Sequence, residues 1–168
     1  ASIEGLRLNP DWTVPPTIKK EDILPKLQED PEYLAGRGME LIRRTPEGRE
    51  TIDPAAVDWE DVTPQELREL EMVQIPGDHN ALGRVRVLMP NNYSVYLHDT
   101  NQKEDFGKQQ LAISSGCVRM KDPLKMAEFI LEDEKGWDRS KIEAAIRQNR
   151  TRDIPITESI PVYFLYYT

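Results

Sequence analysis

The sequence predicts an α+β fold built on a β-rich core. Alternating apolar residues at 82–89 and a second β-rich run at 93–97 flank the turn Pro90–Asn92, which predicts a β-hairpin. Helix signals lie apart from these runs, at Asp122-Pro123 and at Ser140–Glu143. Strands and helices therefore cluster separately, without the βαβ rhythm of a doubly wound sheet.

The first 38 residues predict an apolar segment, a loop and a helix, in that order. Segment 3–8 is short and apolar, and residues 9–16 contain three prolines, which exclude a regular helix or a central strand. We expect an extended loop there that carries Trp12. From residue 17 to Gly38 the pattern is helical, and its apolar stripe consists of Ile23, Leu24 and Leu27.

The rest of the chain predicts shorter elements. Residues 39–42 predict a short strand, and residues 44–62 are polar and turn-rich. Thr63 followed by proline predicts an N-cap and a helix to about Met72. The helix that starts at Asp122 has an apolar face formed by Leu124, Ala127, Ile130 and Leu131. The capping-box pattern at Ser140 predicts another helix to about Gln148, and residues 161–167 predict a final aromatic-rich strand.

The length and composition of the chain limit the classes of protein to which it can belong. With 168 residues the chain is one domain in size, large enough to bury a core without disulfides. The net charge of −8 argues against a nucleic-acid partner, because phosphate binding needs clustered Lys and Arg. No apolar run approaches the roughly 20 residues of a membrane span, and no signal peptide opens the chain.

Cys117 is the single cysteine, so an internal disulfide is excluded and a zinc site of Cys and His alone is disfavoured. Taken alone, a single cysteine is more often a small buried hydrophobe than a nucleophile. Its neighbours favour the nucleophile. Gly116 permits close approach of a substrate, and the main-chain N–H groups of Gly116 and Cys117 are expected to point toward a developing oxyanion.

A cysteine nucleophile needs a base, and the chain contains two histidines. His98 lies at the end of the predicted strand 93–97, where a side chain is held rigidly, whereas His79 lies in a turn. Strand-end placement favours His98 as the base, although a surface or structural role is an alternative for either histidine.

Two motifs carry a resemblance to a known family. Residues 96–100 read Tyr-Leu-His-Asp-Thr, and residues 113–119 read Ile-Ser-Ser-Gly-Cys-Val-Arg, with His98 and Cys117 19 positions apart (117 − 98). This pattern resembles the signature of the YkuD-type L,D-transpeptidases, in which a histidine and a loop precede Ser/Thr-His-Gly-Cys, an apolar residue and Arg or Asn. Residues 80–83, Asn-Ala-Leu-Gly, extend the match.

The loop 9–16 and the helical stretch after it resemble the YcbB-like, large periplasmic branch of the family, in which a lobe caps the active site. Ser115 stands where many members have a second histidine, and that branch tolerates serine there. We therefore expect a single catalytic domain over 1–168, with a helical capping lobe at 17–75 and a catalytic core at 76–168. Strands that precede the loop in the family fold are expected to be missing, so the domain is interpreted as incomplete at its N-terminus.

The resemblance implies a two-step acyl transfer without a metal or organic cofactor. Cys117 attacks the third residue of a peptidoglycan stem peptide, and the thioester passes to another stem to give a 3→3 cross-link. His98 is the implied base, oriented by a main-chain oxygen near Asp99 or by the Asp99 carboxylate. Gly116 and Cys117 are the implied oxyanion donors.

The remaining candidates are assigned to substrate binding. Tyr96 shares the face of His98 by the two-residue period, and Ser114 and Ser115 frame the nucleophile. Arg119 is expected to fix the loop or to pair with a substrate carboxylate, with a structural salt bridge as the alternative. Trp12 is expected to pack on the stem peptide, with ordinary core packing as the alternative.

Two other functions stay open. The first is a carboxypeptidase or hydrolase on the same scaffold, and the second is an inactive cell-wall-binding module. The resemblance also implies carbapenem-type β-lactams as covalent inhibitors and a periplasmic location in a longer, membrane-anchored or secreted chain. The sequence does not predict the oligomeric state.

Overall fold

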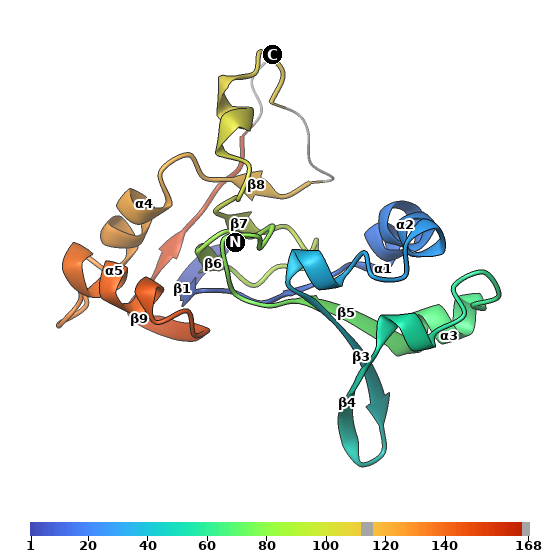
Figure 1. Ribbon diagram of the computed structural model, residues 1–168. Helices are drawn as coiled ribbons and strands as arrows, with labels where there is room; N and C mark the ends of the chain where they lie inside the picture. Colours follow the sequence, from blue (N-terminus) through green and yellow to red (C-terminus); the bar gives the residue numbers. More distant parts are fainter. Residues whose placement is uncertain (112–115, 166–168) are drawn as a thin grey trace. The chain divides into compact units, whose positions relative to one another are not determined.

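The computed structural model describes residues 1–111 and 116–165, and the chain forms two compact units (Figure 1). A discontinuous unit combines Ala1–Pro10 with the chain from Pro76 onward, and an inserted unit comprises Asp11–Ile75. The mixture of two sheets with short helices confirms the predicted α+β class and the β-rich core.

A five-stranded sheet forms the framework of the discontinuous unit. Its order is β8 (Val118–Arg119), β7 (Leu97–His98), β6 (Val85–Leu88), β1 (Ser2–Leu8) and β9 (Arg152–Pro161). Every neighbouring pair is antiparallel except β7 and β8, which are parallel. The apolar segment 3–8 is thus a central strand, so the expectation that strands before the loop are missing is corrected for β1.

Alternation along the strands separates the two faces of this sheet. Leu6, Leu8, Val85 and Val87 point to one face and are at most 1% exposed. The helices α4 (Pro123–Ile130) and α5 (Arg139–Arg147) contribute Ala127, Ile130, Ile142 and Ala145 to the same core cluster. Polar and charged residues of β1, β6, β7 and β8 therefore lie on the other face.

Both helices of this unit begin with an aspartate cap. The Asp122 carboxylate accepts from the N–H of Lys125 at 3.0 Å, which confirms the predicted start of α4. In α5 the Asp138 carboxylate accepts from the N–H of Lys141 at 2.9 Å. The predicted start at Ser140 was therefore two residues late, because Asp138 has the extended backbone and the acceptor that an N-cap needs.

The last strand also differs from the prediction. β9 covers Arg152–Pro161 and pairs with β1 along its length, with a register shift between Ile3 and Gly5. The predicted strand at 161–167 was wrong for the described residues 162–165, which form no regular strand. The predicted residues 166 and 167 lie outside the described part of the chain.

The predicted hairpin is present only in part, because residues 93–96 of the predicted strand 93–97 form no strand and only Leu97 of that run belongs to β7. β6 and β7 pair antiparallel at Arg86 and His98, and a long connection joins them. Asn91 organises this connection, because its Nδ2 donates to the carbonyls of Met89 and Val95, both at 2.8 Å. Its Oδ1 accepts from the N–H groups of Tyr93 and Val95.

The inserted unit contains a sheet as well as helices. Its four strands, in sheet order, are β2 (Trp12–Thr13), β5 (Leu70–Gln74), β3 (Met39–Thr45) and β4 (Gly48–Ile52). The strand predicted at 39–42 is present and longer, whereas β4 was missed because it consists, apart from Ile52, of glycine and polar residues that are exposed. The sequence analysis started this lobe at residue 17, and the unit begins at Asp11.

Helical backbone runs from Pro16 to Glu29, as α1 (Pro16–Ile18), a π-helical turn at Lys19–Ile23 and α2 (Leu24–Glu29). Pro25 lies two positions after the π-helical turn, and its missing N–H interrupts the regular ladder. The helix ends well before the predicted Gly38, because Asp30 precedes Pro31 and adopts an extended backbone. A separate 3₁₀ turn, Ala35–Arg37, ends at the left-handed Gly38.

A complete capping box opens α3 (Pro64–Glu69). The Thr63 hydroxyl accepts from the Glu66 N–H at 3.2 Å, and the Glu66 carboxylate accepts from the Thr63 N–H at 2.9 Å. The cap and the N1 proline are as predicted. The helix ends at Glu69 rather than near Met72, because Leu70 and Met72 are buried in β5.

Replacing Thr63 with alanine is expected to lower the free energy of unfolding by about 1 kcal/mol, because an N-cap and its reciprocal partner are lost together. Urea denaturation followed by circular dichroism measures this change. Thr63→Ser keeps the hydroxyl and is the matched control. Equal losses in the two variants would show that the hydroxyl does not carry the effect.

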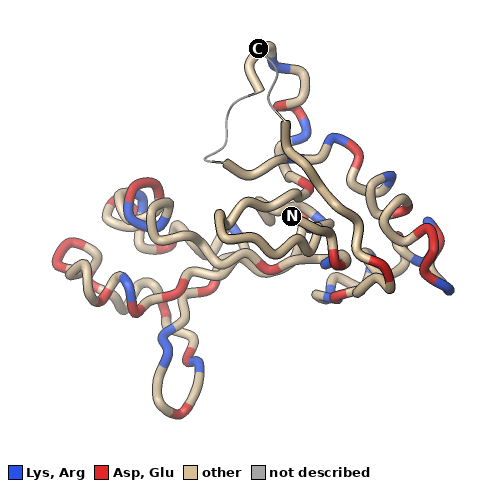
Figure 2. Tube along the Cα trace, turned by 180° about the vertical axis from the view of Figure 1, so that it is seen from behind, with Lys and Arg blue, Asp and Glu red and all other residues tan. Residues whose placement is uncertain are grey.

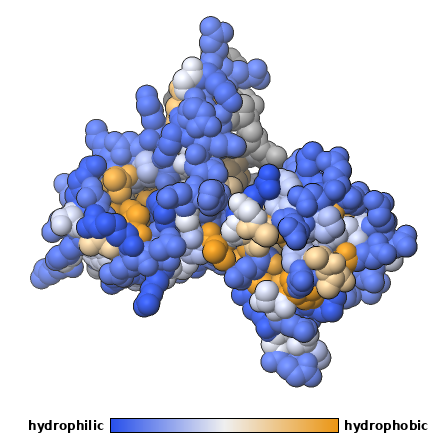
Figure 3. Space-filling model, viewed as in Figure 1, coloured by the Kyte–Doolittle hydropathy of each residue, from blue (hydrophilic) through white to orange (hydrophobic). Residues whose placement is uncertain are grey.

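The surfaces of both units are mainly polar. Acidic and basic positions are interspersed along the trace in Figure 2, and Figure 3 shows apolar residues in patches between hydrophilic ones. The large apolar side chains that are more than half exposed include Tyr93, Leu111, Phe129, Tyr163, Phe164 and Leu165. Within residues 1–111 and 116–165, every helix is too short or too polar to cross a membrane.

Candidate active site

The register of β7 and β8 brings His98 and Cys117 to the same face of the sheet. Leu97 is paired with Val118 and His98 with Arg119, and the Val118 N–H donates to the Tyr96 carbonyl at 2.8 Å. Cys117 comes one residue before β8, so the two-residue period places its side chain on the face of Arg119 and His98. Tyr96 is the residue that this register sets beside Cys117. The thiol side chain is half-buried.

His98 is 6% exposed, and its Nδ1 contacts the main-chain oxygen of Asp99. A carbonyl oxygen only accepts, so Nδ1 carries the hydrogen and Nε2 keeps the lone pair of a base. Burial lowers the pKa of His98 from its ordinary value, because the charged imidazolium is poorly solvated there. The Asp99 carbonyl opposes that shift, and the positive charges of Arg119 and Arg86 add to it.

The Asp99 carboxylate is directed away from the imidazole contact. It accepts from the N–H of Thr100 at 2.7 Å and of Arg84 at 2.8 Å, and it forms an ion pair with Lys103. Of the two groups considered as orienters of His98, the main-chain oxygen is the one at Nδ1. The buried carboxylate instead fixes the backbone that carries this oxygen.

Gly83 packs directly against the Asp99 carboxyl group. A Cβ at this position would lie 2.4 Å from Asp99 Cγ, and the residue has a φ of +61°. The close approach of Asp99 and the left-handed backbone both require glycine at this position, because any other residue would add a Cβ. Asn80, which is fully buried, shapes the same turn: its Oδ1 accepts from the Leu82 N–H at 2.8 Å, and its Nδ2 donates to the Pro10 carbonyl at 2.9 Å.

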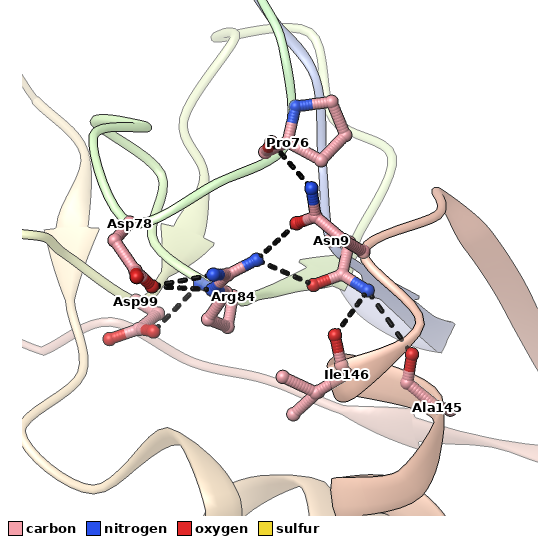
Figure 4. A network of polar contacts seen from close by, with 8 residues as sticks. Asn9, Pro76, Asp78, Arg84, Asp99, Ala145 and Ile146 are labelled. Carbon is pink, nitrogen blue, oxygen red and sulfur yellow. Dashed lines mark hydrogen bonds and ion pairs between the residues drawn. The ribbon is translucent and has the colours of Figure 1, made fainter. Parts of the chain in front are cut away.

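Arg84 connects this turn to the end of β1 (Figure 4). Its guanidinium donates to the Asp78 carboxylate, to Asn9 Oδ1 at 3.2 Å and to Asn149 Oδ1 at 2.5 Å. The main-chain N–H of Arg84 donates to the Asp99 carboxylate, as described above. The network therefore fixes the segment that follows His98 from three distant parts of the chain.

Asn9 joins the same network to α5. Its Nδ2 donates to the carbonyls of Ala145 and Ile146 at 3.2 and 3.0 Å, near the last turn of the helix, as Figure 4 shows. Its side chain is fully buried, and its φ of 48° lies in the left-handed region that asparagine tolerates. Asn9 of the motif 9–16 and Asn80 of the motif 80–83 thus have a structural role in this unit.

Gly116 precedes the thiol with a φ of +133°, a backbone conformation that other residues rarely adopt. Open space surrounds the position of its missing Cβ within the described residues. The conformation of the main chain, rather than crowding, is therefore what demands glycine here. Ser114 and Ser115, which the sequence analysis assigned to the site, lie outside the described residues.

Arg119 pairs with Asp105, a residue that the sequence analysis did not single out. The guanidinium donates to the Asp105 carboxylate at 2.6 Å and to Gln102 Oε1 at 3.3 Å, and Lys108 shares the carboxylate at 2.5 Å. These donors hold the pKa of Asp105 below its ordinary value. Arg119 thereby anchors the loop between β7 and β8, which matches the loop-fixing and salt-bridge alternatives.

The other candidate residues are distributed over the two units. The Tyr96 ring lies under the Arg86 guanidinium at 3.9 Å, on the His98 face of the sheet. His79 is exposed in the turn before β6, where its carbonyl accepts from Asn101. Trp12 belongs to β2 of the inserted unit and packs partly on the apolar cluster there, so its assignment to the substrate stays a prediction.

Sequence reasoning missed the supporting residues because their signals are weak. In the sequence, Gly83 only interrupts an alternating run, and Arg84 and Arg86 resemble ordinary exposed residues of a strand. Asp105 lies in a polar loop with several acidic residues. Among the described residues, no group of three His, Cys, Asp or Glu side chains forms a metal-binding cluster.

The sheet therefore brings a histidine of β7 and the cysteine directly before β8 to one face, which is the arrangement that a base and a thiol nucleophile would need. Comparison with known proteins supplies the family. The model of the YkuD L,D-transpeptidase catalytic domain matches residues 1–143, so the chain belongs to this family. A Haemophilus influenzae protein named "Putative L,D-transpeptidase" is 32% identical over 171 residues, which cover 100% of this chain and 33% of that protein. The chain thus spans about a third of the length of this relative.

Proposed function

We propose that the chain is a peptidoglycan L,D-transpeptidase that forms 3→3 cross-links between stem peptides through a Cys117 thioester. The observation that carries the proposal is the register of β7 and β8, which sets the thiol and the imidazole on one face of the sheet. The family match supports the reaction class, and the stem peptides are the substrates that this class implies.

The first step is acylation of Cys117. His98 Nε2 takes the thiol proton, and the thiolate attacks the carbonyl carbon at the third residue of the donor stem. The main-chain N–H groups of Gly116 and Cys117 stabilise the resulting oxyanion. The C–N bond to the terminal D-alanine breaks, its amine takes the proton from His98, and a thioester remains.

The second step returns the enzyme to its starting state. The side-chain amine of the third residue of an acceptor stem attacks the thioester while His98 takes its proton. The C–S bond breaks, and the thiolate is reprotonated. A buried histidine with a lowered pKa suits both steps, because it is neutral and able to accept a proton near pH 7.

Intact-mass spectrometry with a tetrapeptide stem and an acceptor stem tests the proposal. We expect a mass increase that corresponds to an acyl-enzyme and a cross-linked dimer among the products, both absent with Cys117→Ala. A carbapenem is expected to add covalently to the same residue. A folded wild-type chain that acquires neither adduct would favour the inactive wall-binding module and contradict the proposal.

The same assay separates transfer from hydrolysis on this scaffold. Released D-alanine with a tripeptide product and no dimer would identify a carboxypeptidase. The residues of the loop 9–16 support membership of the YcbB-like branch, and a periplasmic location belongs to the same proposal.

A further inference from the structure

A row of basic side chains crosses the His98 face of the five-stranded sheet. Arg7 of β1 is paired with Arg86 of β6, Arg86 with His98 of β7, and His98 with Arg119 of β8. Residues directly paired across strands point to the same face, so these four side chains lie side by side. The row concentrates positive charge on a protein whose net charge is −8.

The two outer arginines of the row are neutralised by carboxylates. Arg7 forms a bidentate pair with Asp153 at 2.6 and 2.8 Å, and Arg119 pairs with Asp105 at 2.6 Å. Arg86 differs from both. Within residues 1–111 and 116–165 it forms no close ion pair, although its charge helps to lower the pKa of Asp153, and its Nε is buried without a hydrogen-bond acceptor. Its guanidinium lies 3.9 Å from the centroid of the Tyr96 ring.

A small pocket opens beside this guanidinium. Its volume is about 190 Å³, and Arg86, Leu88, Met89, Pro90, Asn91, Ser94 and Tyr96 line it. Tyr96, which lines the pocket, is also the residue that the register sets next to Cys117. Its single charged side chain is the arginine, and the remaining lining is neutral.

We propose that this pocket is the carboxylate subsite for the donor stem peptide, with Arg86 as the binding charge and Tyr96 as its platform. The inference rests on the proposed function, and it assigns a specificity residue to that reaction. Guanidinium groups bind carboxylates through two parallel N–H···O bonds, and stacking on an aromatic ring holds the fork in place. A carboxylate in the pocket would also give this guanidinium the close anionic partner that it lacks among the described residues.

Two carboxylates lie next to the bond that breaks: the terminal carboxylate of the leaving D-alanine and the free carboxylate of a diaminopimelate-type residue at the third position. Binding to the Cys117→Ala protein separates them without any reaction taking place. The peptides are the free tetrapeptide, the same peptide amidated at its C-terminus, and the same peptide amidated at the diamino acid, each titrated by calorimetry.

We expect Arg86→Gln to weaken binding of the free tetrapeptide about 10- to 100-fold, the range of a charge-assisted hydrogen-bonded pair. The peptide that lacks the recognised carboxylate should bind the two proteins equally and weakly. That peptide identifies which carboxylate occupies the pocket. Arg86→Lys should lose part of the affinity, because it keeps the charge and loses the fork.

Arg152→Gln is the matched control, since Arg152 stacks on Trp137 at 4.8 Å elsewhere in the same unit. It should leave every dissociation constant unchanged. Equal binding of the three peptides to the protein with intact Arg86 overturns the proposal, and so does the absence of measurable binding. This comparison needs no change at Arg86, so it holds even if Arg86→Gln fails to fold. Because acylation is not involved, the outcome is independent of whether Cys117 reacts.

Discussion

Replacing His98 with alanine is expected to slow acylation of Cys117 by roughly 10²- to 10⁴-fold, the usual contribution of a general base. The reason is geometric, since His98 shares a sheet face with the thiol and its Nδ1 is held by the Asp99 carbonyl. Stopped-flow measurement of the acylation rate with a carbapenem gives the factor directly. His79→Ala is the matched control and should keep the wild-type rate.

The pH dependence provides a second readout of the same variant. Because burial lowers the His98 pKa, the wild-type rate should rise with pH, and the midpoint of the rise should lie below about 6.5, the ordinary histidine value. This rise should be absent from His98→Ala. A wild-type profile with its midpoint above 6.5, or equal rates in the two proteins, would contradict His98 as the base.

The lowered pKa of His98 also makes the free energy of unfolding depend on pH. The folded state disfavours the protonated imidazole, so the unfolded chain binds a proton first as the pH falls. The free energy of unfolding should therefore be unaffected by His98 above about pH 6.5 and should decrease below it, until the folded-state pKa is passed. The His98→Ala chain should lose this component of the decrease.

Replacing Gly83 with alanine is expected to lower the free energy of unfolding by roughly 2–4 kcal/mol, among the larger effects of a single substitution. The left-handed backbone accounts for about 1–2 kcal/mol of this loss. The rest comes from the overlap with the Asp99 carboxyl group, which has to shift and weaken its bonds to Arg84 and Thr100. Urea denaturation measures the loss.

Gly77→Ala is the control for this substitution. Nothing lies within 4 Å of the position of its Cβ, and it has no left-handed backbone. It should change the free energy of unfolding by less than about 0.5 kcal/mol. If Gly83→Ala changed the free energy of unfolding as little as Gly77→Ala, this would show that Asp99 has room to move. Its carboxylate would then not hold the segment after His98. Gly83→Ala is also expected to slow the acylation of Cys117, because a displaced Asp99 would no longer hold its main-chain oxygen at His98 Nδ1.

The sequence by itself determined the features that depend on neighbouring residues. The caps at Asp122 and Thr63, the α+β class and the strand placement of His98 all follow from motifs a few residues long, because helix capping and strand alternation are local effects. The spacing of His98 and Cys117 pointed to the family that the comparison then showed. Some local predictions still failed, such as the start of α5, where a neighbouring aspartate was the better cap.

Only the tertiary structure decided which distant residues meet. β1 lies between β6 and β9, so Arg7 pairs with Asp153, 146 positions away, and Arg86 comes to stand beside His98. The strand β4 exists because β3 offers it an edge, and its polar residues carry no apolar pattern of their own. Strand register depends on hydrogen bonds to a partner that the local sequence does not specify. For this reason the contacts of Asp99 and the row of basic side chains could not be predicted from the sequence.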